Sequence, residues 1–304
     1  MNKFKLVAYA LLALFGSYVL YAPIGMWMAD NTTVNTKGEV TTKQGESRAV
    51  AMAVMLMQDQ LDHGWLPNNP AWQPSAWLDN TPHFQDGILK VEAQFAYAMA
   101  QFLGRTRGSS SMDKDLDSAQ GKMNYAPDVW FYDPSTSWYG ITATSETQFH
   151  KGIEHYMAYQ ARLAKGNAIF DVRADSLIST LGQFSNNMGS LTANIEKHIA
   201  TNPNGLFDTV VDDIYYFNKG QAYAYYMILR ELGKDFNAII KEKKQEQVWG
   251  QMLESLRIVA ELEPAIVFNG DPDTMFLNSH LSSQGFHVLL ANKRMKEVMD
   301  GLLK

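Results

Sequence analysis

The pattern of apolar and charged positions divides the chain into an N-terminal apolar segment and a longer, amphipathic remainder. Residues 6–29 contain no charged side chain, whereas Lys3 and Lys5 precede them and Asp30 follows them. A helix of this length extends roughly 36 Å, which exceeds the thickness of a hydrocarbon core of about 30 Å. The segment therefore predicts one membrane-spanning helix.

A cleaved signal peptide is the alternative interpretation of this segment, because a basic start precedes the apolar stretch. Its cleavage sites are poor, since a cut after Ala22 would place Pro23 first and a cut after Ala29 would leave bulky Trp27 at the minus-three position. We therefore expect an uncleaved anchor that contacts inner-membrane lipid through residues 6–29. The lysines before the helix predict a cytoplasmic N-terminus and a periplasmic remainder.

The pattern changes again after the anchor. Residues 31–46 are rich in Thr, Asn, Lys and Gly and contain few apolar side chains, which predicts a polar tether. From Ser47 onward, apolar residues recur at helical spacing. We therefore divide the chain into an anchor with a short cytoplasmic N-terminus at 1–30, the tether, and a helical periplasmic domain at 47–304.

The helical spacing predicts a mostly α-helical fold, with a compact multi-helix bundle and aromatic loops after the transmembrane helix. Ser47 is the expected cap of the first bundle helix, and Ser145 with Gln148 forms an expected capping box for a later helix. The expected helices cover residues 47–63, 84–103, 145–165, 171–200, 213–232, 235–243, 245–262 and 280–303.

Loops with two different compositions interrupt these helices. Residues 65–82 contain three tryptophans and four prolines, which exclude a long helix and predict an irregular aromatic loop. Residues 124–144 form a second aromatic loop, whereas residues 105–120 are polar and predict a surface loop. Sustained alternation typical of strands is absent from the sequence.

The amino-acid composition of the chain argues against several classes of function. The chain has no cysteine, which excludes disulfides, thiolate metal sites and cysteine nucleophiles. Acidic residues outnumber basic ones by 32 to 26, which argues against nucleic acid as a partner. The sequence also lacks a phosphate-binding glycine loop, a serine-hydrolase elbow and a metal-ligand motif, so we expect neither a cofactor nor a metal.

Four acidic residues are candidate catalytic groups. Asp79 and Asp86 lie near the start of one expected helix, and Asp212 and Asp213 lie at the start of another. Across a bundle, such carboxylates could form the acid and base of a glycan-cleaving enzyme. Structural roles are the favoured interpretation, because acids before prolines build turns and acids at helix starts are stabilised by the helix dipole.

Aromatic and polar residues in the same regions are candidate binding groups. Trp77 could stack on a sugar or peptide while Asp79 and Asn80 form hydrogen bonds to it, although loop tryptophans are often structural. Gly220 is a small residue that would allow two helices to approach closely. Further candidate binding residues are Tyr215, Gln221, Asn269, Asn278 and His280.

Six ordered blocks of sequence together carry a family resemblance. The blocks are Trp77 to Asn80 with Pro82 and Gly87; Ser145-Glu146 with Gly152-Ile153 and Ala161 to Leu163; Phe170 with Arg173 to Asp175; Gly189 to Leu191; Asp212-Asp213 with Gly220 to Ala222; and Asn269-Gly270 with Asn278 and His280. They resemble an uncharacterised bacterial envelope family, domain of unknown function 2333. The chain departs from the family pattern at Thr81 and in the longer aromatic insert from Trp130 to Tyr139.

The resemblance implies a single anchor followed by a helical extracytoplasmic domain, and it assigns neither substrate nor catalytic residues. We therefore expect a non-enzymatic scaffold or binding component of an envelope assembly, with an envelope protein as its partner. The alternative is a protein that binds or cleaves cell-wall glycan, with peptidoglycan held by the aromatic loops and the paired carboxylates.

Overall fold

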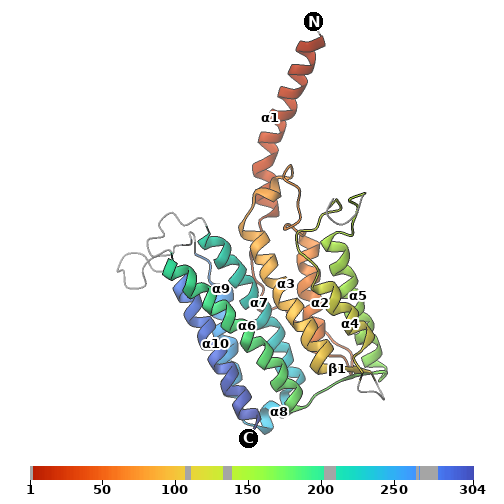
Figure 1. The fold of residues 1–304 in the computed structure, drawn as a ribbon, viewed down its shortest axis with the longest axis vertical. Helices are drawn as coiled ribbons and strands as arrows, with labels where there is room; N and C mark the ends of the chain where they lie inside the picture. Colours follow the sequence, from red (N-terminus) through yellow and green to blue (C-terminus); the bar gives the residue numbers. More distant parts are fainter. Residues whose placement is uncertain (1–2, 107–110, 133–138, 202–209, 265–266, 268–279) are drawn as a thin grey trace.

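The computed structural model describes residues 3–106, 111–132, 139–201, 210–264, 267 and 280–304. Helix α1 (Lys3–Ala29) projects from one end of a bundle of roughly aligned helices (Figure 1). Its apolar side chains are largely exposed, and by length and composition it could cross a membrane. We call the end of the bundle beside α1 the anchor end and the opposite end the far end.

The remaining elements confirm a mostly α-helical bundle, and most expected helices lie within a few residues of their predicted bounds. They are α2 (Arg48–His63), the 3₁₀ turn η1 (Pro74–Trp77), α3 (Asn80–Ala98), the π-helical turn η2 (Met99–Leu103), β1 (Gly104–Thr106), α4 (Lys114–Met123), α5 (Ser145–Ala164), β2 (Ala168–Phe170), α6 (Ala174–Thr201), α7 (Val211–Asp235), α8 (Asn237–Glu242), α9 (Glu246–Glu261) and α10 (His280–Leu302).

The long helices form two groups that share one hydrophobic core. Helices α2, α3, α4 and α5 pack together on one side, and α6, α7, α9 and α10 pack on the other (Figure 1). Helices α3 and α7 join the two groups along a long central contact. Every long helix of the bundle therefore buries one face, as the helical spacing of apolar residues predicts.

Two glycines set the distance between α3 and α7. A methyl group on Gly87 would overlap the carbonyl oxygen of Phe217, and one on Gly220 would overlap the carbonyl oxygen of Phe84. Each helix thus presents a glycine to the backbone of the other. The expectation that Gly220 allows close helix packing is confirmed.

The caps of two helices test the predicted starts. Ser47 caps α2 by accepting a hydrogen bond from the Val50 amide, as expected. Helix α5 is instead capped by Thr144, so the predicted capping box at Ser145 was wrong by one residue. The hydroxyl of Ser145 is buried and donates to the Ala126 carbonyl oxygen at 2.8 Å, which holds the second aromatic loop against α5.

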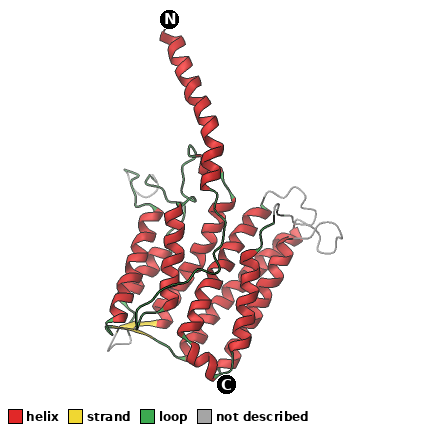
Figure 2. Ribbon diagram, turned by 180° about the vertical axis from the view of Figure 1, so that it is seen from behind, coloured by secondary structure: helices red, strands yellow, loops and turns green. Residues whose placement is uncertain are grey.

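The predicted surface loop at 105–120 is the largest local difference between sequence and structure. Part of it is strand β1, which pairs antiparallel with β2 at the far end (Figure 2). Another part is α4, which begins after the buried residue Asp113. Asp113 accepts two hydrogen bonds from Arg162, at 2.7 and 2.6 Å, so α5 fixes the start of α4.

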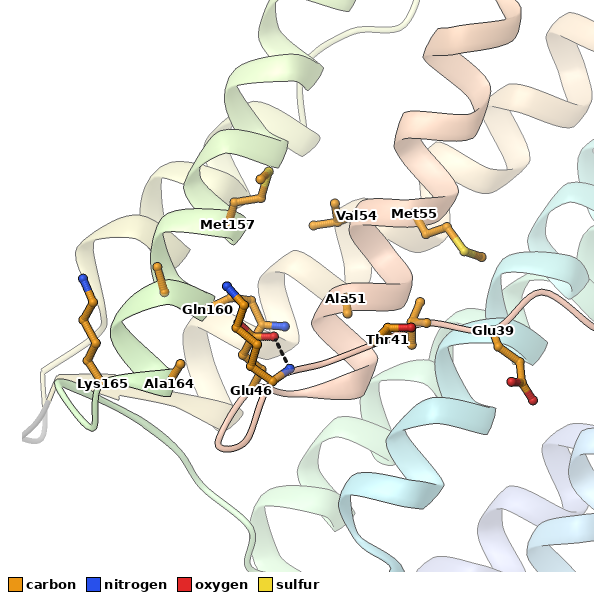
Figure 3. Close-up of a pocket in the computed structure, with 13 residues that line it drawn as sticks. Glu39, Thr41, Glu46, Ala51, Val54, Met55, Met157, Gln160, Ala164 and Lys165 are labelled. Atoms are coloured by element: carbon orange, nitrogen blue, oxygen red, sulfur yellow. Dashed lines mark hydrogen bonds between the residues drawn. The ribbon is translucent and has the colours of Figure 1, made fainter.

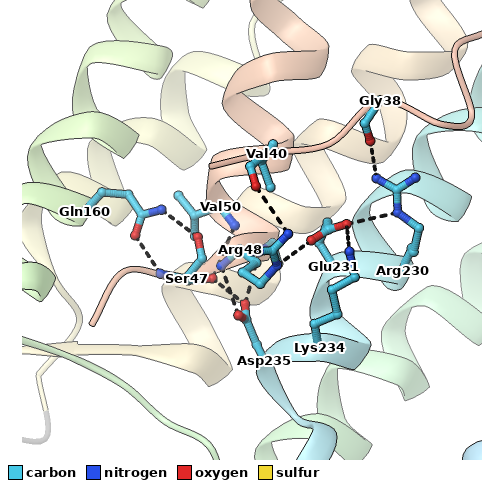
Figure 4. Close-up of polar contacts among 11 residues, drawn as sticks. Gly38, Val40, Ser47, Arg48, Val50, Gln160, Arg230, Glu231, Lys234 and Asp235 are labelled. Atoms are coloured by element: carbon cyan, nitrogen blue, oxygen red, sulfur yellow. Dashed lines mark hydrogen bonds and ion pairs between the residues drawn. The ribbon is translucent and has the colours of Figure 1, made fainter. Parts of the chain in front are cut away.

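Residues 31–46, predicted to be a polar tether, follow the surface of the bundle from the anchor end to the far end, and we call them the strap. The guanidinium of Arg230 donates to the Gly38 carbonyl oxygen, and that of Arg48 donates to the Val40 carbonyl oxygen at 3.2 Å (Figure 4). Val34 and Val40 pack against the core. The strap is therefore fastened along its length.

Candidate functional site

Three of the four candidate carboxylates meet at the anchor end, where α3 and α7 both begin. The Nε2 atom of His83 lies 3.3 Å from a carboxylate oxygen of Asp213. Burial is the largest influence on Asp213, and the negative charges of Asp212 and Asp79 act in the same direction. Together they hold the pKa of Asp213 above its ordinary value although His83 opposes them.

The same carboxylates also serve the helix starts. Asp79 accepts a hydrogen bond from the Asn80 amide at 2.9 Å, and Asp212 accepts one from the Asp213 amide at 3.2 Å. Both contacts agree with the structural roles that the sequence favoured. Among the described residues, His, Asp and Glu side chains form no group of three arranged to hold a metal ion.

The fourth candidate, Asp86, opens onto a different space. A cavity of about 270 Å³ is bordered by Asp86 and Lys90 of α3, Phe217 of α7, and Tyr125 of the second aromatic loop. Burial, and to a smaller extent the charge of Asp128, raises the pKa of Asp86 to about 7. A carboxyl group with this pKa can exchange a proton near neutral pH.

The candidate binding residues do not converge on one surface. Trp77 is 56% exposed, and its indole nitrogen donates to the Ala71 carbonyl oxygen at 3.0 Å. Tyr215 is fully buried, and its hydroxyl donates to the Leu262 carbonyl oxygen at 3.1 Å. Gln221 is buried where α7 crosses α3.

The remaining candidates lie at the C-terminal part of the chain. His280 is the first residue of α10 and is half-buried. Asn269 and Asn278 lie outside the described residues. The contacts described for Trp77, Asp79 and Tyr215 hold loops and helix starts in place, and any role of these residues in binding or catalysis stays a prediction.

A buried glutamate in α3 was missed by the sequence-based search. Glu92 is fully buried, and both its carboxylate oxygens lack a hydrogen-bond partner within the described part of the chain. Burial raises its pKa well above the ordinary value. Glu92 lies between Ile88 and Phe95 on the apolar face of the helix, and an acid in that pattern was the signal that could have revealed it.

We expect Glu92→Gln to raise the free energy of unfolding at pH 8 by on the order of 1 kcal/mol, because this carboxyl ionises freely in the unfolded state whereas burial opposes its ionisation in the folded state. A raised pKa makes this group favour folding below its ordinary pKa of 4.5, and that contribution is lost as the pH rises. Urea unfolding from pH 4.5 to 8 should therefore show a smaller pH dependence in the variant than in the wild type. A variant less stable than the wild type at pH 8 would contradict this prediction.

A groove lies between α2 and α5 on the bundle surface. It encloses about 820 Å³ near the far end, and the strap forms one of its walls (Figure 3). Its apolar lining includes Val54 and Met55 of α2 and Met157 of α5, and Met157 is 58% exposed. Short side chains at Ala161 and Ala164 keep the α5 side shallow.

Charged residues of both signs surround the apolar floor of this groove. Glu39, Lys43 and Glu46 come from the strap, and Lys165 follows the end of α5. Gln160 fixes the corner between them, since its amide accepts from the Ser47 amide at 2.9 Å and donates to the Ser47 carbonyl oxygen at 2.6 Å. The groove thus combines a fixed wall with a methionine-rich floor, a composition that adapts to apolar partners.

A charge cluster on α7 holds the strap that forms this wall. The side chain of Glu231 is fully buried, and three cations contact it: Arg48 at 2.6 Å, Arg230 at 2.9 Å and Lys234 at 2.7 Å (Figure 4). Next to it, Asp235 accepts hydrogen bonds from the Arg48 amide and the Ser47 hydroxyl, at 2.9 and 2.7 Å. The start of α2 and the strap are therefore fastened to α7 by charge.

Comparison with protein families places the chain among known sequences. Residues 6–204 match the family model of an uncharacterized protein conserved in bacteria, domain of unknown function 2333. The chain belongs to this family. The matched part of this family member includes α1, the strap and α2 to α6, together with the groove. Asp212, Gln221 and the rest of α7 to α10 lie beyond the match. No curated protein and no solved structure matches the chain.

Proposed function

We propose that the chain is a single-pass inner-membrane protein whose periplasmic bundle binds another envelope protein and acts as a scaffold. The groove between α2 and α5 is the observation that carries the proposal. Helix α1 supports the anchoring, because it is long and apolar enough to span a bilayer. The fastened strap supports the scaffold role, because it holds the bundle beside α1 and leaves the groove wall in place.

The partner segment that suits the groove is an amphipathic helix with charges of both signs beside its apolar stripe. Helix-in-groove recognition uses apolar anchors one turn apart, and Val54, Met55 and Met157 supply the matching floor. Acidic residues such as Glu39 and Glu46 complement basic flanks, and Lys43 and Lys165 complement acidic ones. A partner of this kind buries the exposed side chain of Met157.

We expect a photo-reactive amino acid at position 157 to cross-link a specific envelope protein in intact cells, whereas the same amino acid at Gln251 should not. Gln251 is a matched control, because it is exposed on α9 away from the groove. Mass spectrometry would identify the protein. Its affinity for the purified full-length chain should fall at least about tenfold in Met157→Glu, a change of about 1.4 kcal/mol. Equal affinity for wild type and variant would exclude the groove as the binding site.

A glycan-related function has one specific observation in its favour. Asp79, Asp212 and Asp213 gather with His83 at the anchor end, and the exposed ring of Trp77 lies in the loop that leads to Asp79. Paired carboxylates beside an aromatic ring are the groups that glycosidases use. Release of cell-wall fragments by the wild type, with loss of that activity in Asp213→Asn, would favour this function over the scaffold.

A further inference from the structure

The loop between α2 and α3 lies against α1 far from the end of that helix. The hydroxyl of Tyr18 donates to the Trp72 carbonyl oxygen at 3.0 Å, and its ring lies 5.9 Å from the ring of Trp77. Pro74 lies close to Gly25, so α1 and η1 run side by side over this stretch. At 1.5 Å per residue, Tyr18 is roughly 16 Å from the last residue of α1.

If the outer boundary of the hydrocarbon core lay on the N-terminal side of this loop contact, the part of α1 inside the membrane would be too short to cross it. From Leu6 to Tyr18 the helix extends roughly 18 Å, whereas a hydrocarbon core is about 30 Å thick. The apolar span therefore has to continue about eight residues beyond Tyr18, and any tilt of the helix lengthens that need. The residues that touch Tyr18 lie at a level that the membrane occupies.

We propose that residues 69–78 insert into the outer leaflet beside α1, as a second membrane contact of the bundle. This inference rests on the proposed anchoring by α1. The segment contains no charged residue, and its two prolines lack an amide hydrogen that would need a partner. The side chains of Trp72 and Trp77 are 62% and 56% exposed, so their large apolar rings are free to contact lipid.

Internal hydrogen bonds prepare this loop for an environment with little water. The Trp77 indole nitrogen donates to the Ala71 carbonyl oxygen, and the Gln73 amide donates to the Pro70 carbonyl oxygen at 2.8 Å. Asn69 donates to the Ser75 hydroxyl at 2.9 Å. Non-helical backbone at membrane depth is tolerated where it packs against protein, and here the loop packs against α1.

The second aromatic loop extends the same surface. Trp130 packs edge-to-face against Trp72, with ring centroids 5.0 Å apart, and Phe131 packs against Trp130 at 4.0 Å. The ring of Phe131 is 47% exposed. The aromatic side chains thus gather at the anchor end, where two loops meet beside α1.

Single-cysteine labelling of the full-length chain tests the insertion, and the absence of native cysteine leaves no background. An environment-sensitive fluorophore is attached at Gln73→Cys, Leu12→Cys or Lys241→Cys, and the protein is reconstituted into phosphatidylethanolamine and phosphatidylglycerol vesicles. Gln73 is exposed and its side chain does not cap η1, so the fold should tolerate the label. Leu12 reports on the anchor, and Lys241 in α8 reports on the far end.

We expect the probes at positions 12 and 73 to be quenched by lipid-attached nitroxide and to lose quenching by aqueous iodide, whereas the probe at 241 should behave oppositely. If the probe at 73 is as accessible to iodide as the probe at 241 while the probe at 12 is shielded, the inserted loop is wrong and the anchor stands. If the probe at 12 is also accessible to iodide, the anchor and the loop insertion both fail.

Discussion

Gly87→Ala should lower the free energy of unfolding by about 3 kcal/mol, the largest loss that we expect from adding a single methyl group to this chain. The added methyl would overlap the carbonyl oxygen of Phe217 and crowd the amide nitrogen of Gln221. These are backbone atoms of a long helix and cannot rotate away, so α3 and α7 would have to separate. Because this contact joins the two helix groups, the cost is felt throughout the core.

Thermal and urea unfolding measure the effect, and Gly250→Ala is the matched control. Gly250 also lies within a helix, but a methyl group there meets no atom within 4 Å. The control should gain about 0.5–1 kcal/mol, because alanine lowers the conformational entropy of the unfolded chain without a clash. Gly220→Ala should resemble Gly87→Ala, because its methyl group would overlap the Phe84 carbonyl oxygen. Equal stability of Gly87→Ala and the control would contradict the close crossing.

Periodicity was sufficient to predict the helical bundle, because each long helix buries one continuous face. The same reasoning failed where a helix depends on a distant residue. Helix α4 has Leu116, Ala119 and Met123 at helical spacing, but the polar residues around them dominated the pattern. Its cap, Asp113, is stabilised by Arg162 of α5, a contact between residues far apart in the chain. Long-range charge pairs of this kind leave no periodic signal.

The candidate site shows a similar division between local and long-range information. Asp79, Asp212 and Asp213 were recognised at helix starts, and only the packing of α3 beside α7 brings Asp79 to the other two. The groove was missed, because Val54 and Met157 belong to different helices and each fits an ordinary bundle pattern. The polar composition of the strap indicated a tether. Its attachment depends on Arg230 and Arg48, which sequence alone could not assign to strap carbonyl oxygens.

Glu231→Gln should lower the free energy of unfolding by about 3 kcal/mol, because it leaves three cations without their shared carboxylate. This value lies at the lower end for a buried ion pair, because Arg48 and Lys234 are partly exposed to water. Hydrogen exchange should also increase in the strap, since Arg48 and Arg230 hold its carbonyl oxygens while they are positioned by Glu231. The groove then loses one wall before the bundle unfolds.

The pH dependence gives an independent measurement of the same cluster. Burial acts to raise the pKa of Glu231, but hydrogen bonds from Lys234 and Arg48 outweigh it and hold the pKa below the ordinary value of 4.5. The stabilisation is therefore fully present above that value and is lost as the pH falls through the pKa of the folded state. Wild type should lose this contribution in acid, whereas Glu231→Gln has none to lose.

Glu254→Gln is the matched control for this substitution, because Glu254 also pairs with an arginine, at 2.7 Å from Arg257, but is largely exposed. An exposed pair contributes about 0–1 kcal/mol, so we expect a small change in unfolding and no change in strap exchange. If Glu231→Gln is no more destabilising than the control, the cations of α2 and α7 do not depend on the buried carboxylate. If only the strap exchange increases, the cluster fastens the strap without stabilising the core, and the groove wall can be released on its own.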